Sequence, residues 1–487
     1  MKKYIFAILS SALIGFSACS EDTLDEINKN TEDPAPEIVP AYLQLSEAIM
    51  STGFSTVSGD LAFYLSSLTE QEIGVGNNQL AKAELRNSVE WASSTTFNNV
   101  WNSTYTNLLN IREIIRKIET EVPGNVGQYD LLGIAQVLEA LNWGILTDVH
   151  GDIPYSEALK GQEILQPKLD SQEDVYEGIL YTLDEAIKNL EKGISMKSSK
   201  DQDLAFGGDA KKWMATAYAL KARYLIHQLA VKPSVLSLAK EAAEMAVELG
   251  FETCQITEFN GVTCDNPWSA FFWSREYTAS SKTVVDLMVA NNDPRLDAYT
   301  YGTGIGYAPG DRDVTLVTNA YSALAWPYWL DMGYQPLHLM TKSELYFILA
   351  ETQLRSEPAE DATEAFQIAV EASVAEILDW TGEDTSKAAA FAASLGTPTL
   401  KTLFEQKYLA QCVDEQIETY NDLRRLEAMG EEYVVLTNPN NSQSGVNRFP
   451  YRLPYGNSSA TSNPNVADAY GDGFYIYEKK TWINGGN

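Results

Sequence analysis

Apolar side chains recur at three- and four-residue spacing through most of the chain, which is the pattern of helices with one buried face. The clearest case is 171–193, which opens with Ser171 and Asp174 as a capping box. It closes at Gly193, a residue suited to a left-handed helix C-terminus. Its buried stripe consists of Val175, Ile179, Leu180, Leu183, Ile187 and Leu190. This segment therefore predicts an amphipathic helix with defined ends.

The same periodicity predicts further helices in almost every part of the chain. They span 39–71 with a break near Gly53, 97–122, 129–146, 211–230, 234–250, 343–355, 362–380 and 399–429. They follow one another as hairpins, but no strict repeat motif recurs. The pattern favours a mostly α fold of tetratricopeptide-like helix pairs. Trp101, Trp143 and Trp213 fall on the apolar stripes and are expected in the core.

Two regions, 251–335 and 433–487, break the helical pattern and are rich in glycine, asparagine and aromatic residues. Loops held on a rigid scaffold are where binding residues concentrate. We therefore expect residues 39–487 to form one helical domain whose binding face is built from these loop-rich regions.

The N-terminal segment has the form of an export signal. Lys2 and Lys3 precede a short apolar run that is shorter than the roughly 20 residues of a spanning helix. Small residues lead to Cys19, which is typical of a lipoprotein signal, although an ordinary cleaved signal is the alternative. We assign 1–18 as the signal peptide, Cys19 as the lipidation site and 19–38 as an acidic, proline-containing tether.

Composition narrows the function. The net charge of −32 disfavours nucleic acid, because phosphate binding needs clustered lysine and arginine. Cys254 and Cys264 are close enough in sequence for either a disulfide or two free thiols, and Cys412 falls in a helical pattern that predicts a buried thiol. The widely separated His150, His227 and His338 form no local metal motif, so neither a metal nor another cofactor is expected.

Six stretches resemble, in order, the SusD/RagB family of nutrient-binding outer-membrane lipoproteins. They are Leu24–Asn30 with Pro34, Leu146–Ala158, Pro167–Tyr176, Asn292–Leu296, Ala350–Glu351 and Arg424–Leu426. The chain departs from the family at Thr31–Asp33, where relatives often carry Asn-Pro-Asn. The resemblance implies a SusD-like helical fold that is lipid-anchored at the outer membrane, with its body exposed at the cell surface. It also implies a partner, a TonB-dependent transporter of the SusC type, and an oligomeric ligand that is usually a glycan and in some members a peptide.

A glycan site needs flat aromatic rings for stacking, flanked by polar groups that hydrogen-bond hydroxyls. The aromatic and basic candidates in the first loop-rich region are Trp268, Trp273, Arg275, Tyr301, Tyr307, Tyr321, Trp326, Tyr328 and Trp329. Asn77 and Asn78, in an earlier loop, are further polar candidates. The alternative for each aromatic is that it packs a loop onto the scaffold.

The leading hypothesis is non-enzymatic capture of an oligomeric nutrient, with a glycan expected, and its delivery to the transporter. A surface glycoside hydrolase is one alternative, since 67 acidic residues could contain a catalytic pair roughly 5 to 10 Å apart. A helical-repeat scaffold for protein interactions is the other alternative. Asp311, Asp313 and Asp331 could hold a cation, but solvated carboxylates are commoner in so acidic a chain. Gly302–Gly306 lacks phosphate-loop spacing and is interpreted as a turn.

Overall fold

Helices dominate the described part of the chain, as the apolar periodicity predicts. A computed structural model describes residues 39–75, 79–86, 93–275, 278–300, 302–310, 333–442 and 449–486. Residues 41–487 cluster into one compact unit, and the fold given below is that of this unit. Among the described residues, no helix is both long and apolar enough to cross a bilayer.

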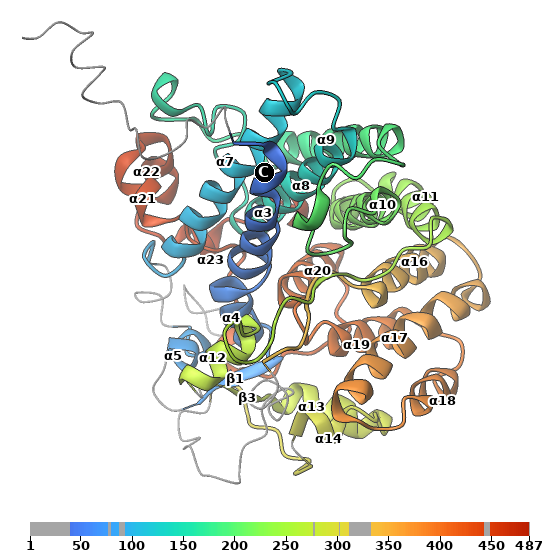
Figure 1. Cartoon of the computed structure of the whole chain (residues 1–487). Coiled ribbons are helices and arrows are strands. Elements are labelled where there is room, and N and C mark those ends of the chain that lie inside the picture. The colour runs from blue at the N-terminus through green and yellow to red at the C-terminus, as the bar shows by residue number, and fades with distance from the viewer. Residues whose placement is uncertain are drawn as a thin grey trace, which may run out of the picture. The chain divides into compact units, whose positions relative to one another are not determined.

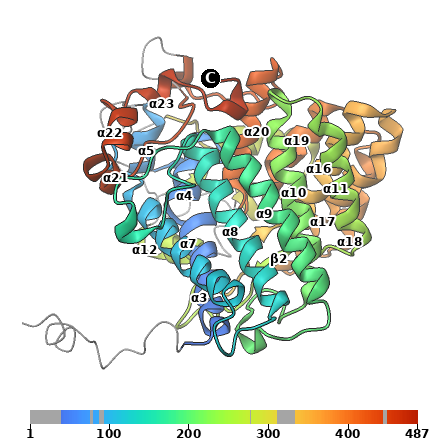
Figure 2. The same ribbon diagram turned by 90° about the horizontal axis from the view of Figure 1, so that it is seen from above.

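One series of helices packs side by side, each against the next along the chain (Figure 2). Its members are α7 (Asn98–Glu119), α8 (Tyr129–His150), α9 (Gln172–Lys192), α10 (Ala210–His227), α11 (Val235–Glu248), α16 (Lys342–Ser356), α17 (Thr363–Thr381) and α18 (Ser386–Ser394). Trp101, Trp143 and Trp213 are each 1% exposed, which confirms their prediction as core residues. The expected helix pairs are present as α8 with α9, α10 with α11 and α16 with α17.

A second set of helices packs against the inner side of this series. It contains α3 (Leu45–Ser51), α4 (Gly59–Leu68), α19 (Leu400–Ala410) and α20 (Gln416–Met429). The helix α20 contacts α4, α8 and α10, so it joins the N-terminal helices to the series. Unlike an ordinary core helix, α20 buries charged side chains such as Glu418, Arg424 and Arg425.

Short strands and helices lie beside α4 (Figure 1). Strand β1 (Glu72–Gly74) pairs antiparallel with β3 (Thr278–Ser280), with Ile73 opposite Ala279. Strand β2 (Cys254–Ile256) pairs antiparallel with β4 (Leu337–Met340). The same region of the fold contains the short helices α5 (Gln79–Glu84), α12 (Pro267–Arg275), α13 (Lys282–Asn291) and α14 (Leu296–Thr300).

The structure corrects several sequence predictions of element type. The region 251–335 contains α12, α13 and α14, and the region 433–487 contains α21 (Asn457–Ser462), α22 (Pro464–Tyr470) and α23 (Tyr475–Glu478). Within their described parts, these loop-rich regions therefore contain short helices joined by turns.

Two glycines at predicted helix boundaries have packing roles. The helix α3 ends at Ser51 and Gly53 lies in a π-helical turn, Thr52–Val57, so the expected break near Gly53 is present. Ser58, which is extended, and Gly59, which has φ +66°, separate this turn from α4. A Cβ at Gly53 would lie 2.5 Å from the Leu337 side chain, so this glycine permits close packing against β4. Gly193 ends α9 with φ −89° and is not left-handed. It is needed because a Cβ there would overlap the backbone nitrogen of Asp130.

The described cysteines are free thiols. Cys254 and Cys412 are buried and Cys264 is half-buried. Of the two alternatives for Cys254 and Cys264, the structure shows two free thiols rather than a disulfide. Burial raises the pKa of the Cys412 thiol, in keeping with the expected buried thiol.

Candidate functional site

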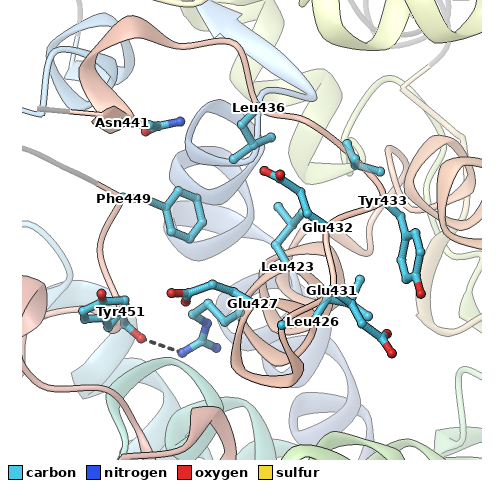
Figure 3. A pocket seen from close by; sticks show the side chains of 13 residues that line it. Leu423, Leu426, Glu427, Glu431, Glu432, Tyr433, Leu436, Asn441, Phe449 and Tyr451 are labelled. Carbon is cyan, nitrogen blue, oxygen red and sulfur yellow. Dashed lines mark hydrogen bonds between the residues drawn. The ribbon is translucent and has the colours of Figure 1, made fainter. Parts of the chain in front are cut away.

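A cavity of about 500 Å³ opens at the C-terminal end of α20, and we refer to it as the α20 pocket (Figure 3). It is lined by Leu423, Arg424, Leu426, Glu427, Gly430, Glu431, Glu432, Tyr433, Val434, Leu436, Asn441, Phe449 and Tyr451. A site of this size accommodates a few sugar rings or a compact ligand. The lining combines aromatic rings, aliphatic groups and carboxylates, which is the chemistry that a carbohydrate requires.

The end of α20 sets the shape of the pocket. Gly430 adopts a left-handed conformation with φ 73°, and the backbone N–H of Glu431 donates to the Leu426 carbonyl at 2.8 Å. This arrangement is a glycine-terminated helix cap that turns the chain sharply. As a result Glu431, Glu432 and Tyr433 leave the helix along the pocket rim instead of continuing its axis.

Half-buried aromatic residues form part of the wall. The Phe449 ring lies 5.5 Å from that of Tyr420, and the Arg86 guanidinium carbon lies 5.9 Å from the Phe449 centroid. Figure 3 shows the Phe449 ring directed toward Leu423 and Leu436 across the cavity. An apolar ring face with a cation behind it is a suitable platform for stacking against sugar C–H groups.

Carboxylates surround the opening. Glu427 accepts from Lys480 at 3.0 Å and Glu431 accepts from Arg355 at 2.7 Å, while Glu432 is exposed. The Glu427–Lys480 pair is partly exposed and therefore weak, so the oxygens of Glu427 and Glu432 can also accept hydrogen bonds from ligand hydroxyls. Glu431 is held more firmly, by two hydrogen bonds from the mostly buried Arg355.

The floor of the pocket is fixed by Arg424. This guanidinium donates to the carbonyls of Tyr451 at 2.8 Å and Asp148 at 2.9 Å, and to the Asn421 side chain at 2.6 Å. Burial lowers the pKa of Arg424 from its ordinary value. Because its donors are used internally, Arg424 supports the pocket rather than offering a free charge to a ligand.

Several of the predicted site residues do not lie in the exposed loops that the sequence had suggested. Trp268 lies in α12 and is 2% exposed, with its ring edge-on to Phe63 at a centroid distance of 4.6 Å. A buried indole cannot present its face to a sugar, so the expectation of an exposed loop aromatic at Trp268 is wrong. Trp273 and Arg275 also belong to α12. Tyr307 is half-buried and packs on Ile73, Val75 and Ala279, as a residue that holds its loop on the scaffold does.

The remaining predicted site residues stay predictions, because they fall outside the described part of the chain. They are Asn77, Asn78, Tyr301, Tyr321, Trp326, Tyr328, Trp329, the acidic Asp311, Asp313 and Asp331, and the lipidation site Cys19. The structure instead draws attention to Tyr433, Phe449 and Tyr451, which sequence reasoning left within a general loop region. Phe449 and Tyr451 flank Pro450 in the sequence, but no sequence signal indicates that these two aromatic residues pack over α20.

A second polar cluster is fully buried between α8, α10 and α20. One ligand atom each of Asp148, His227 and Glu418 lies within 4.8 Å of the others. His227 Nε2 is 2.7 Å from Glu418, and the Tyr176 hydroxyl donates to Asp148. Burial lowers the pKa of His227, but attraction from Glu418 and Asp148 outweighs it and raises this pKa to about 9. The imidazole of His227 thus lies between two carboxylates that favour its protonated form.

Comparison with known proteins identifies the family that shares this architecture. Residues 61–456 match the family model SusD-like, described as starch-binding and associating with the outer membrane. A SusD/RagB family protein of known structure from Bacteroides thetaiotaomicron is 32% identical, with a TM-score of 0.80, covering 92% of this chain and 100% of that one.

Two more distant structures show the same fold. A chitin-binding protein is 24% identical with a TM-score of 0.71, covering 92% of this chain and 100% of its own. A chitin-binding SusD homolog from Flavobacterium johnsoniae is 19% identical with a TM-score of 0.67, covering 91% and 98%. None of the curated proteins matches the chain. The family match over most of the length, together with the close structural relative, shows that this chain belongs to the SusD-like family.

Proposed function

We propose that the protein captures an oligosaccharide at the outer membrane and passes it to a TonB-dependent transporter of the SusC type. The match of residues 61–456 to a family described as starch-binding and associating with the outer membrane carries this proposal. The family description is that of binding proteins, which supports capture without turnover. Lipidation of Cys19 would hold the protein at the membrane, with its body at the cell surface.

The α20 pocket is our proposed contact for part of the oligosaccharide. The Phe449 ring offers an apolar face, and the exposed Glu432 carboxylate offers hydrogen-bond acceptors in the same lining. Stacking and hydroxyl recognition are thereby available in one cavity. The predicted aromatics Tyr301, Tyr321, Trp326, Tyr328 and Trp329 remain proposed contacts for other parts of the same oligomer.

Calorimetric titration with maltoheptaose and chitohexaose, fragments of starch and chitin, tests the proposal. Phe449→Ala is expected to weaken binding of the preferred oligomer at least tenfold, because it removes the stacking surface. Tyr181→Ala is the matched control, since Tyr181 is 67% exposed on α9, away from the pocket lining. Equal affinity of the two variants would exclude the α20 pocket as a contact.

Two further measurements address the alternatives. Release of new reducing ends during incubation with either oligomer would establish a hydrolase and contradict capture without turnover. Affinity purification from solubilised outer membranes is expected to recover a large β-barrel transporter. Recovery of soluble helical proteins instead would favour the scaffold alternative.

A further inference from the structure

Three charged residues are buried together between the end of α4 and the end of α5. Glu70 and Arg86 are 0% exposed and Glu84 is 1% exposed, and we call these three residues the carboxylate hub. Buried ionised groups are costly unless they are paired and fully hydrogen-bonded. Their hydrogen-bond partners therefore indicate what the hub does.

Glu84 joins β1 to a turn that is remote in sequence. One carboxylate oxygen accepts from the backbone N–H of Gly74 and from the Ser67 hydroxyl at 2.9 Å. The other oxygen accepts from the backbone N–H of Gly310 at 2.7 Å, across 226 residues of sequence. Glu84 thus anchors the turn 302–310, which leads in sequence to the predicted aromatics of 321–329.

Glu70 performs the same role for the segment after α20. Its oxygens accept from the backbone N–H groups of Thr437 and Asn438, both at 2.7 Å, and from the Thr283 hydroxyl at 2.6 Å. The Asn441 amide donates to it at 3.3 Å. Glu70 also has φ +60°, a left-handed conformation that costs a non-glycine residue free energy and persists where surrounding contacts impose it.

Arg86 connects the hub to the α20 pocket. Its guanidinium donates to the Asn441 side-chain oxygen at 2.9 and 2.7 Å and lies beneath the Phe449 ring. Asn441 and Phe449 both line the pocket. The wall that faces the cavity is therefore held from behind by a buried cation, which is itself attracted by Glu84 and Glu70.

We propose that Glu70 and Glu84 are positioning residues for ligand binding: they hold the 437–441 segment, which carries the pocket residue Asn441, and the 302–310 turn in one fixed arrangement. The pocket's part in this inference rests on the proposed function. A carboxylate suits the task because its two oxygens accept several N–H groups arriving from different directions. An apolar residue of similar size would fill the same space without fixing either loop.

Isosteric amides test the proposal in the full chain. Glu84→Gln leaves either the Gly74 or the Gly310 N–H facing an amide NH₂, because an amide has one acceptor oxygen. Glu70→Gln does the same to Thr437 or Asn438. The matched control is Asp203→Asn, which alters a 5% exposed carboxylate that accepts from Gly208 N–H and Trp213, outside the hub.

Hydrogen–deuterium exchange without ligand provides the first readout. Glu84→Gln is expected to raise exchange at least threefold in 72–75 or 302–310, but not in 437–441. Glu70→Gln should raise exchange in 437–441 but not in 72–75 or 302–310. Asp203→Asn should leave exchange unchanged in all three segments. A general loss of stability would raise exchange equally in 72–75, 302–310 and 437–441 and also in α8. That uniform rise, or no rise at all, would overturn the proposal.

Affinity for maltoheptaose and chitohexaose, measured well below each variant's unfolding temperature, provides the second readout. Glu70→Gln is expected to bind the preferred oligomer at least tenfold more weakly, and Asp203→Asn within twofold of the wild type. Unchanged affinity alongside a looser 437–441 segment would refute a role in ligand binding. A wild type that binds neither oligomer would contradict the proposed function and the hub's effect on affinity, whereas the exchange pattern would still decide whether the hub fixes the two segments.

Discussion

Buried ion pairs around α10 show how this acidic protein uses burial to fix charge. Arg223 pairs with Glu344, and His227 lies between Glu418 and Asp148, all in the interior. Removing one partner of such a pair leaves the other buried and uncompensated, which is strongly destabilising. These pairs therefore make the packing of α10 on α20 sensitive to pH and to single substitutions.

His227 gives a prediction with a defined sign. Its pKa is about 9 in the folded protein against 6.5 for an ordinary histidine, so folding strengthens proton binding. The resulting stabilisation is complete below pH 6.5 and is lost as pH rises through 9. The full shift corresponds to about 3 kcal/mol, and roughly 2–3 kcal/mol of it is lost between pH 6.5 and pH 9. Urea unfolding at pH 6.5 and pH 9 should show the wild type losing that much more free energy of unfolding than His227→Gln. Parallel losses in both proteins would exclude His227 as the titrating group.

Trp268 is predicted to matter for folding rather than for direct ligand contact. Its ring is buried against Phe63, so Trp268→Ala removes a large core side chain at a cost of about 3–5 kcal/mol. Thermal unfolding should show a lowered midpoint, with oligosaccharide affinity retained at temperatures where the variant is folded. An unchanged midpoint with weakened binding would restore the original assignment of Trp268 to the ligand site.

These residue predictions differ in how well sequence could support them. Trp101, Trp143 and Trp213 fall on apolar stripes of long helices, and periodicity alone placed them in the core. Trp268 lies in a nine-residue helix, which is too short for periodicity to be recognised among glycines and asparagines. Composition therefore suggested a loop, although tertiary packing against α4 decides the conformation.

At the scale of elements, the sequence predicts those helix ends that are formed by interactions between neighbouring residues. The N-cap half of the predicted capping box of α9 is present: the Ser171 hydroxyl accepts from Asp174 N–H at 3.2 Å and donates to the Asp174 carboxylate at 2.7 Å. By contrast, the predicted continuous helix 399–429 is divided into α19 and α20. Asp414 there has φ +61° and accepts from His338 N–H at 3.1 Å, while Glu415 accepts from Thr341 N–H at 3.1 Å. These bonds to β4 and α16 divide the helix, and no local sequence signal reveals them.

Two serines at helix N-termini give a matched test of capping. Ser171 and Ser234 are both exposed N-cap residues, but the side chain of Ser234 makes no capping hydrogen bond. Ser171→Ala should lower the free energy of unfolding by about 1 kcal/mol, because an N–H at the start of α9 loses its acceptor. Ser234→Ala should change it by less than half as much. Equal effects in chemical denaturation would show that capping does not distinguish them.

At the scale of the whole chain, periodicity predicted which helices exist and which are paired, but not what they surround. The α20 pocket joins the end of α20 to Phe449 and Tyr451, and the hub behind it joins Glu70 to Asn441 and Glu84 to Asn440. Each junction links segments that are distant in sequence, and their meeting is set by tertiary packing. Family resemblance predicted a helical scaffold that carries a binding face, whereas the individual contacts required the structure.

The last prediction concerns attachment of the protein to the membrane. If Cys19 carries acyl chains, burial of their methylenes supplies about 0.8 kcal/mol each, and the protein should partition into detergent. Cys19→Ser removes the acyl acceptor and should move the protein to the aqueous phase in detergent phase separation. Ser20→Ala is the adjacent control and should remain in the detergent phase. This assay needs no transporter, so it separates lipid anchoring from retention by a membrane partner. A Cys19→Ser protein that still enters the detergent phase would show that its attachment does not depend on this cysteine.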